Sequence, residues 1–380
     1  MSDRRFSVAM VAPAFPLSLG TVDGGTAGVA WYLCQALRDT GELDLEVIRP
    51  FAPKGTPALF TLGGIRVHAL SRPSWQPRPL HLLWTAQRQV RRLVRSLKPD
   101  LAHVQAMTGL AACLAQPCVF TLHGISEIDA QFRGARWSAV IRQAILGCLE
   151  KRARQRVRNV IAISPYTRRF ISSANGQRVW DIANPVPDAY FMVQRQPQPG
   201  RVFSASQISP LKNVAALIRA FAELSRKLPA ARLRLAGAQS DGPYGQECRR
   251  LAGELGVGDQ VAFLGLLNMD QVRNELAHAA VFALCSLQEN APLSIAESMA
   301  AGVPVMATRV GGVPWMVEDG VTGRLLDPGD QGQMSGTLGR MLLTDNLAAM
   351  SQAAKSKAEQ TYRSALIAKK TIKMYHELLQ

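Results

Sequence analysis

Short apolar runs alternate with longer amphipathic stretches along this chain, and the alternation starts again after a proline-rich segment. In the first half, apolar runs from 7–15 to 160–164 are separated by helical stretches such as 29–38 and 80–97. Strands that alternate with helices form parallel β-α-β units, which assemble into an open sheet with helices on both faces. We therefore expect an α/β fold built on doubly wound parallel sheets.

The proline-rich segment 185–200, PVPDAYFMVQRQPQPG, has neither helical nor strand periodicity, and the alternation resumes with the strand-like run 201–206. A length of 380 residues also suits two domains, because one domain typically takes about 150 residues. We expect a first domain over 1–187, a linker over 188–200 and a second domain over 201–357.

The end of the chain, 358–380, places apolar side chains at helical spacing, so we expect a terminal helix there. Neither a membrane-spanning helix nor a signal peptide is expected, because no apolar run reaches 18 residues and the opening run looks like a strand. The six cysteines form no CxxC pair and mostly lie in apolar segments. This pattern suggests a reducing, cytoplasmic location and no structural zinc.

Positive charge is concentrated in the first half of the chain, whose formal total is +16. Residues 1–190 hold 24 basic and 12 acidic residues, against 20 and 16 in 191–380. The densest stretch, 133–158, has one acidic residue, Glu150, and many basic ones, among them Arg133, Arg136, Arg142, Lys151 and Arg152. An anionic membrane face or a phosphorylated partner would suit it, and so would a plain solvated helix. Nucleic acid is not expected, because only Trp137 is interleaved and no binding motif is present.

Two candidate sites are weak when taken singly. Gly24 and Gly25 follow the first strand, where glycine lets a ligand approach the backbone and a helix start offers N–H groups to an anion. A tight turn would explain them equally. His123 ends an apolar run before Gly124, so a neutral imidazole could hydrogen-bond a hydroxyl or act as a base. A satisfied strand-end histidine is the alternative, and it is the stronger one for His103.

The segment 284–330 is the most informative. It places Glu289 in a loop before a helix that we expect to begin near Pro292, and Glu297 within that helix. The free N–H groups of 290–294 would face the same space as the carboxylates. Because carboxylates bind hydroxyl donors and free N–H groups bind oxyanions, a ligand with sugar hydroxyls and phosphate fits.

This segment resembles the signature of the retaining family-4 glycosyltransferases (glycosyl transferases group 1), which have the GT-B fold. Two glutamates separated by seven residues are followed by AAGVPVMATRVGGVPWMVEDGVTG. The resemblance extends over essentially the whole chain, to GG at 24–25, LHG at 122–124, NPVP at 184–187 and ISPLKN at 208–213. It implies two Rossmann-like domains facing a central cleft, with the helix 358–380 crossing back onto the first domain.

The resemblance also implies roles for single residues. A nucleotide-diphosphate-sugar donor would bind in the cleft, mostly on the second domain, with Glu297 on the ribose hydroxyls and Glu289 on the sugar hydroxyls. Lys212 would neutralise the diphosphate, Gly25 would approach it from the first domain, and His123 would contact the transferring sugar. The backbone beside the helix start would orient sugar and phosphate, through Asn290, Ala291, Leu293 and the neighbours of Pro292.

Family resemblance further implies transfer with retention of configuration and without a metal or other cofactor, because a basic residue and helix-start dipoles stabilise the leaving diphosphate. No DxD metal motif appears in the sequence. Glu289 is the only evident candidate for an enzymic nucleophile. The acceptor would bind the first domain, and the basic charge there suggests a saccharide or a lipid-diphosphate-linked saccharide at the inner membrane face, as in surface polysaccharide or glycolipid assembly.

One position departs from the family pattern. Gln207 stands where an arginine usually lies, five residues before Lys212. Glutamine can hydrogen-bond phosphate but brings no charge, and a charge-assisted bond is roughly twice as strong. Lys212 alone, a substitute such as Arg309, or a different leaving group would account for it. Two alternatives therefore stay open: a protein that binds nucleotide-sugar or glycan without transfer, and a GT-B epimerase that needs no acceptor.

Overall fold

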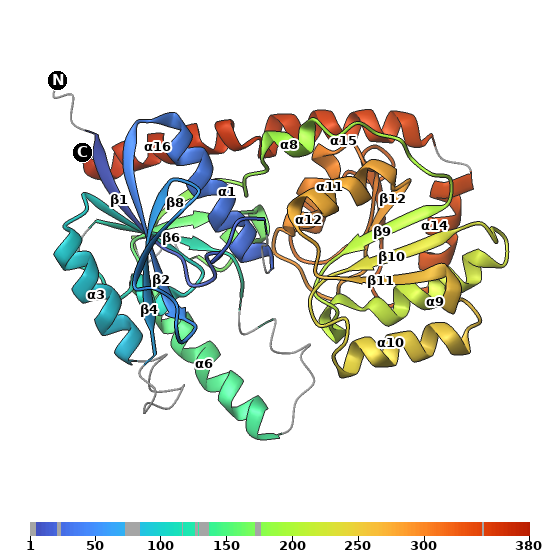
Figure 1. The fold of residues 1–380 in the computed structure, drawn as a ribbon, viewed down its shortest axis with the longest axis horizontal. Helices are drawn as coiled ribbons and strands as arrows, with labels where there is room; N and C mark the ends of the chain where they lie inside the picture. The colour runs from blue at the N-terminus through green and yellow to red at the C-terminus, as the bar shows by residue number, and fades with distance from the viewer. Residues whose placement is uncertain are drawn as a thin grey trace.

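The structure is a computed structural model with two α/β domains side by side (Figure 1). It describes residues 5–20, 24–72, 84–115, 117–125, 128, 137–171, 176–343 and 346–380, with side chains for all of these except 137–146 and 331.

The first domain is built on an eight-stranded sheet of order β3-β4-β2-β1-β5-β6-β7-β8. Neighbouring strands pair in parallel, as expected, except β3 with β4. These two form an unexpected antiparallel hairpin, whose turn is made by Gly63 and Gly64, both with positive φ, as tight hairpin turns require. The strands are β1 (Phe6–Val11), β2 (Leu43–Ala52), β3 (Leu59–Leu62), β4 (Ile65–Ser71), β5 (Leu101–Gln105), β6 (Cys118–Leu122), β7 (Asn159–Ala162) and β8 (Arg178–Asp181).

Helices cover both faces of this sheet. Along β1, Val8 and Met10 join one hydrophobic cluster while Ala9 and Val11 join another, because successive strand residues point to opposite faces. The first cluster includes α1 (Gly25–Thr40) and α16 (Ser364–Leu379), and the second includes α3 (Ala86–Leu97) and α4 (Thr108–Ala111). Helix α4 also contacts α6 (Trp137–Arg156). Two short helices follow, α7 (Pro165–Arg168) and α8 (Asp188–Phe191).

The second domain has a six-stranded parallel sheet of order β11-β10-β9-β12-β13-β14. Its strands are β9 (Arg201–Ala205), β10 (Arg232–Ala236), β11 (Val261–Gly265), β12 (Val281–Leu284), β13 (Val305–Thr308) and β14 (Gly323–Leu326). Its helices are η4 (Pro210–Lys212), α9 (Val214–Ser225), α10 (Pro243–Glu254), η5 (Gly258–Gln260), α11 (Met269–His278), α12 (Leu293–Ala300), α13 (Val313–Met316), α14 (Gln331–Leu343) and α15 (Leu347–Tyr362).

The chain ends in two helices rather than in the single helix expected over 358–380. Helix α15 packs on α12 of the second domain, and α16 packs on α1 of the first, so both run along one side of the molecule (Figure 1). Between them, Arg363 is extended, and Val186 pairs with the break by donating to Tyr362 O at 2.7 Å and accepting from Ser364 N at 3.0 Å. The linker expected over 188–200 is not irregular throughout, because its first four residues form α8.

Candidate functional site

A cavity of about 480 Å³ lies between the two domains. Its lining comes from the ends of strands and the starts of helices, where doubly wound sheets bind ligands. All of the residues expected at a donor site from the sequence lie on its wall: Gly24, Gly25, His123, Gln207, Lys212, Glu289, Asn290, Ala291, Pro292, Leu293 and Glu297.

Two helices begin at this cavity without a side-chain cap and without an acidic residue in the first turn. Helix α1 follows Gly24, whose φ of +91° favours glycine, and a Cβ added at Gly25 would meet no protein atom within 4 Å. Helix α12 begins directly after Pro292, near the start expected from the sequence. A helix start carries roughly half a positive charge, so two of them make the cavity favourable to an anion.

Lys212 and Glu289 contact each other across the wall of the cavity. Lys212 Nζ lies 2.5 Å from Glu289 Oε1, and the Ser286 hydroxyl donates to the same oxygen at 2.7 Å. The side chains are 20% and 9% exposed, so this ion pair is largely shielded from water. Among the described residues that line the cavity, Lys212 is the only lysine or arginine.

Gly311 and Gly312 explain part of the long motif that follows the two glutamates. A Cβ at Gly311 would lie 1.7 Å from the carbonyl oxygen of Glu289, and one at Gly312 would lie 1.7 Å from that of Asn290. The Gly312 amide donates to Glu289 O at 3.0 Å. The glycine pair therefore lets the loop carrying Glu289 lie directly against it, a role that the sequence pattern alone did not reveal.

Glu297 lies on α12 and meets the first domain. The Tyr32 hydroxyl of α1 donates to Glu297 Oε1 at 2.9 Å and lies 3.0 Å from the Tyr190 hydroxyl of α8. Burial raises the pKa of the Glu297 carboxyl to about 7, against the opposing effects of the two tyrosine hydroxyls and the Arg273 charge. Neither tyrosine could be predicted as a site residue from the sequence, because neither stands in a motif.

The loop that carries Glu289 is also bonded to the first domain. Ser164 Oγ donates to Asn290 O at 2.9 Å, and Asn184 Nδ2 donates to Ala291 O at 3.0 Å. The side-chain oxygens Asn184 Oδ1 and Asn290 Oδ1 are buried without a partner among the described residues. Both residues line the cavity, although these two oxygens are themselves buried beneath its surface.

His123 lies on the cavity wall with its Nε2 at hydrogen-bonding distance from Gln105 Oε1. Burial lowers the pKa of His123 to about 4, so the ring is neutral at physiological pH. His103 is fully buried and contacts the Tyr375 hydroxyl at 2.6 Å and the Thr121 hydroxyl at 2.7 Å, which agrees with the interpretation of a satisfied strand histidine.

The charge missing at Gln207 is not supplied by Arg309. Gln207 lines the cavity, whereas Arg309 does not. The Arg309 side chain is 47% exposed and pairs with Asp319 at 3.4 Å. Arg309 therefore does not replace the arginine that the family usually has at the position of Gln207.

The predicted basic surface is described only in part. Arg133 and Arg136 lie outside the described residues, as does the side chain of Arg142, while Lys151 and Arg152 are exposed on α6. Among the described helices, none has the length and apolar character needed to cross a membrane. Within the same described ranges, no three His, Cys, Asp or Glu side chains gather in a group that could hold a metal ion.

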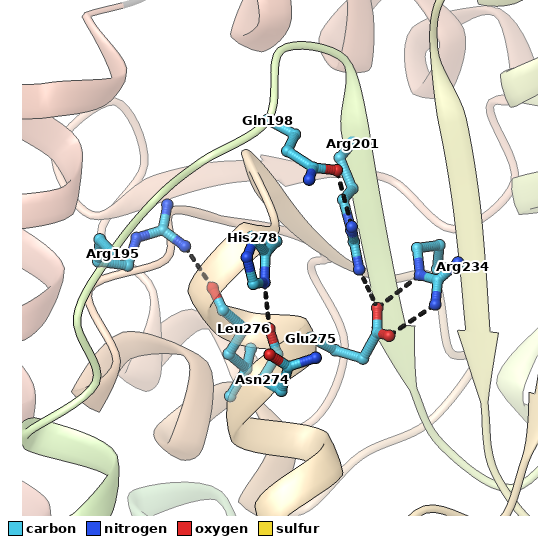
Figure 2. A network of polar contacts seen from close by, with 8 residues as sticks. All are labelled: Arg195, Gln198, Arg201, Arg234, Asn274, Glu275, Leu276 and His278. Atoms are coloured by element: carbon cyan, nitrogen blue, oxygen red, sulfur yellow. Dashed lines mark hydrogen bonds and ion pairs between the residues drawn. The ribbon is translucent and has the colours of Figure 1, made fainter.

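A buried ion-pair network holds α11, which supplies Met269 and Val272 to the cavity wall. Glu275 accepts from Arg201 at 2.8 Å and from Arg234 at 2.6 and 2.7 Å (Figure 2). At the end of the same helix, Arg195 donates to Leu276 O, where helix carbonyls lack partners (Figure 2). Burial lowers the pKa of Arg195 to about 10, which still leaves it charged.

Known protein families and individual proteins resemble this chain in sequence. Residues 191–359 match the family model described as glycosyl transferases group 1, and residues 23–190 match that of glycosyltransferase family 4. The chain is similar to a D-inositol 3-phosphate glycosyltransferase of Mycolicibacterium smegmatis, with 38% identity over 40% of this chain and 35% of the relative. It is also similar to a GDP-mannose-dependent phosphatidylinositol monomannoside mannosyltransferase of the same organism, with 32% identity over 50% of this chain and 54% of the relative. The chain thus spans between about a third and a half of the length of these two relatives.

Solved structures share the fold over nearly the whole chain. A sucrose-phosphate synthase of Thermosynechococcus elongatus superposes with a TM-score of 0.82 and 20% identity, covering 98% of this chain and 99% of that one. Anabaena HepE in complex with UDP and glucose superposes with a TM-score of 0.74 and 19% identity, covering 97% and 99%. The two family models adjoin and cover both domains, so the chain belongs to the family-4, group-1 glycosyltransferases and has the GT-B fold.

Proposed function

We propose that this protein transfers a sugar from a nucleotide-diphosphate-sugar to a hydroxyl of a saccharide or lipid-linked acceptor, with retention of anomeric configuration. The observation that carries the proposal is the polarity of the cavity. Its wall combines the carboxylates of Glu289 and Glu297 with the cation Lys212 and two uncapped helix starts. Hydrogen-bond acceptors suit a ligand rich in hydroxyls, and positive charge beside them suits a diphosphate.

The reaction needs charge to be stabilised on the departing diphosphate as the anomeric C–O bond breaks. Lys212 and the N-termini of α1 and α12 supply positive charge without a metal ion. The Glu289 carboxylate is paired with Lys212 and accepts from Ser286, and both contacts lower the nucleophilicity of the carboxylate. We therefore favour attack by the acceptor hydroxyl on the face from which the diphosphate leaves, with the hydroxyl proton passing to the leaving oxygen.

Nucleotide-sugar binding and turnover test the proposal separately. A panel of nucleotides and nucleotide-sugars should include one that raises the Tm, because a ligand at 100 times its Kd adds about 2.7 kcal/mol to stability. Release of the nucleoside diphosphate in the presence of candidate acceptors then measures transfer. A protein whose Tm responds to no member of the panel would contradict the proposed site.

Binding without transfer is the second candidate function, and Gln207 is the observation that favours it. Among the residues that the structure describes, the cavity wall has one cation where the family usually has two, and Arg309 pairs with Asp319 outside the wall. If a nucleotide-sugar binds tightly but is neither hydrolysed nor transferred with any acceptor, this second function replaces the first.

The acceptor is proposed to be a lipid-linked saccharide at the cytoplasmic face of an anionic membrane, as in surface polysaccharide or glycolipid assembly. Helix α3 supports this, because the segment 84–99 contains no acidic residue and exposes Arg88, Arg92 and Arg95. Trp84, at the start of this segment, is 63% exposed. Through α4, which contacts both α3 and α6, this surface adjoins the helix that bears Lys151 and Arg152.

Charge reversal on α3 should abolish vesicle binding. Each basic residue near an anionic surface contributes about 1 kcal/mol, so Arg88→Glu, Arg92→Glu and Arg95→Glu together should weaken partition by at least about 100-fold. The measurement is co-sedimentation at low salt with vesicles of phosphatidylglycerol and phosphatidylcholine. The matched control reverses Arg219, Arg226 and Lys227, which are exposed on the second domain and should leave partition far less affected. Equal binding of the wild type to neutral and anionic vesicles would remove the argument.

Nucleotide affinity should rise with pH through neutrality. The pKa of Glu297 is raised to about 7, and its carboxylate is the form that accepts from ribose hydroxyls. The ionised fraction grows about tenfold between pH 6 and pH 8, so the Kd of a bound nucleotide should fall by up to that factor. Isothermal titration of wild type and Glu297→Gln over this range is the measurement. The variant should bind more weakly at pH 8 and with little pH dependence, and an equally steep profile in the variant would assign the titration to another group.

A further inference from the structure

A line of buried polar side chains runs from the cavity to the last helix of the chain. His103 and Gln105 lie two residues apart on β5, and Thr121 and His123 are two apart at the end of β6, so all four point to one face of the sheet. His123 Nε2 contacts Gln105 Oε1, Gln105 Nε2 lies 3.0 Å from His103 Nε2, and His103 Nδ1 lies 2.6 Å from the Tyr375 hydroxyl of α16.

The direction of these hydrogen bonds follows from the amide of Gln105. Its nitrogen faces two acceptors, His103 Nε2 and the sulfur of Met10 at 3.5 Å, and sulfur cannot donate. Its carbonyl oxygen faces His123 and can only accept, so His123 Nε2 carries the proton. His103 then accepts at Nε2 and, as a neutral ring, donates from Nδ1 to Tyr375.

We propose that Gln105 is a positioning residue that fixes His123 as its Nε2–H tautomer, with Nδ1 left as an acceptor for a substrate hydroxyl. His123 Nδ1 has no partner among the described residues, and His123 lines the cavity. His103 fixes the orientation of the Gln105 amide by accepting from its Nε2, and Tyr375 in turn accepts from His103 Nδ1. A neutral His123 is consistent with its lowered pKa. Helix α16 thus acts on the tautomer of His123 through Tyr375, His103 and Gln105.

The Nε2–H tautomer of His123 has a spectroscopic signature that does not depend on activity. Long-range ¹H–¹⁵N spectra of histidine-labelled protein should show His123 as a single Nε2–H tautomer near pH 7. The chain has six histidines, so the His123 signals can be assigned by their loss in His123→Gln. An Nδ1–H tautomer, or an exchanging mixture in the wild type, would overturn the proposal.

Variants separate the role of Gln105 from packing. Gln105→Leu should convert His123 to a mixture of tautomers, whereas Gln105→Glu keeps an acceptor toward His123 and should keep the Nε2–H form. Thr121→Val is the control, because it removes the other contact to His103 Nε2 and leaves the Gln105–His123 bond intact. A His123 signal that moves equally in Thr121→Val and Gln105→Leu would assign the effect to general disruption.

The effect of Gln105 on the rate of transfer rests on the proposed function, and it is measured separately from the tautomer of His123. Misorientation of one group by about 1 Å can cost about 100-fold in rate, so Gln105→Leu should lower kcat by up to that factor, with the KM for donor changed far less. Gln105→Glu should recover most of the loss. If no transfer is found with any donor, the proposed function fails, while the tautomer spectra still decide the role of Gln105. A wild-type kcat in Gln105→Leu would overturn the link between the tautomer and the reaction.

Discussion

Replacing Lys212 with methionine is expected to reduce sugar transfer by about 10³-fold in kcat/KM, the loss typical of removing a group that stabilises developing charge. Methionine approximates the length of the lysine stem, so the change removes mainly the charge. No other lysine or arginine lines the cavity among the described residues, and Gln207 brings none. Most of the loss should therefore appear in kcat, measured with the donor that the Tm panel identifies.

Two further variants show whether the lost charge is the cause. Lys227→Met changes the same residue type at an exposed position on the second domain and should leave transfer unchanged. Adding Gln207→Arg to Lys212→Met should recover at least about tenfold, because a charge-assisted bond to phosphate replaces a neutral one. A Lys212→Met enzyme within a few-fold of wild type would mean that the helix starts alone carry the diphosphate.

A separate contribution comes from the Lys212–Glu289 contact itself. Removing the lysine leaves the Glu289 carboxylate, 9% exposed, without its cation. The double variant Lys212→Met, Glu289→Gln removes both charges and leaves no unpaired one. Comparison of its Tm with that of each single variant separates loss of stability from loss of catalysis.

Most of the fold could be predicted from periodicity, because parallel strands and their helices are local patterns. The hairpin strand β3 was missed because Leu59–Leu62 is short and only its last residue is well buried. The break at Arg363 was missed because helical spacing continues across it, and only the pairing with Val186, far away in sequence, fixes it. Such non-local pairing leaves no periodic signal.

In the candidate site, too, some residues could be predicted from the sequence and others could not. Glu289, Glu297 and Lys212 stand in a motif that could be recognised, and all three line the cavity. Tyr32 and Gln105 carry no such signal, because each lies in an otherwise apolar run and meets its partner across the fold. Tyr32 bonds a residue 265 positions away, so only the packing of the two domains against each other reveals it.

The second large effect expected is on stability, and it concerns the network around Glu275. Glu275→Gln should lower the free energy of unfolding by about 3–5 kcal/mol, because it leaves two arginines short of their counter-charge in a largely buried place. The Glu275 side chain is 8% exposed, and those of Arg201 and Arg234 are 14% and 28% exposed. Asp241→Asn is the control, since Asp241 is 90% exposed and its pair with Arg249 should contribute less than about 1 kcal/mol.

The pH dependence of this difference identifies its electrostatic origin. Burial alone would raise the pKa of Glu275, but hydrogen bonds and charges from Arg234 and Arg201 outweigh it and hold the pKa below its usual value. A depressed carboxyl pKa stabilises the fold above the unfolded-state pKa, so the contribution is lost as pH falls below about 4.5 and through the folded value. Urea unfolding of wild type and Glu275→Gln should therefore differ most at pH 7 and converge only as the pH falls below about 4. A difference that is constant with pH would point to altered packing of α11. Because α11 lines the cavity, a bound nucleotide should recover part of the lost stability in either case.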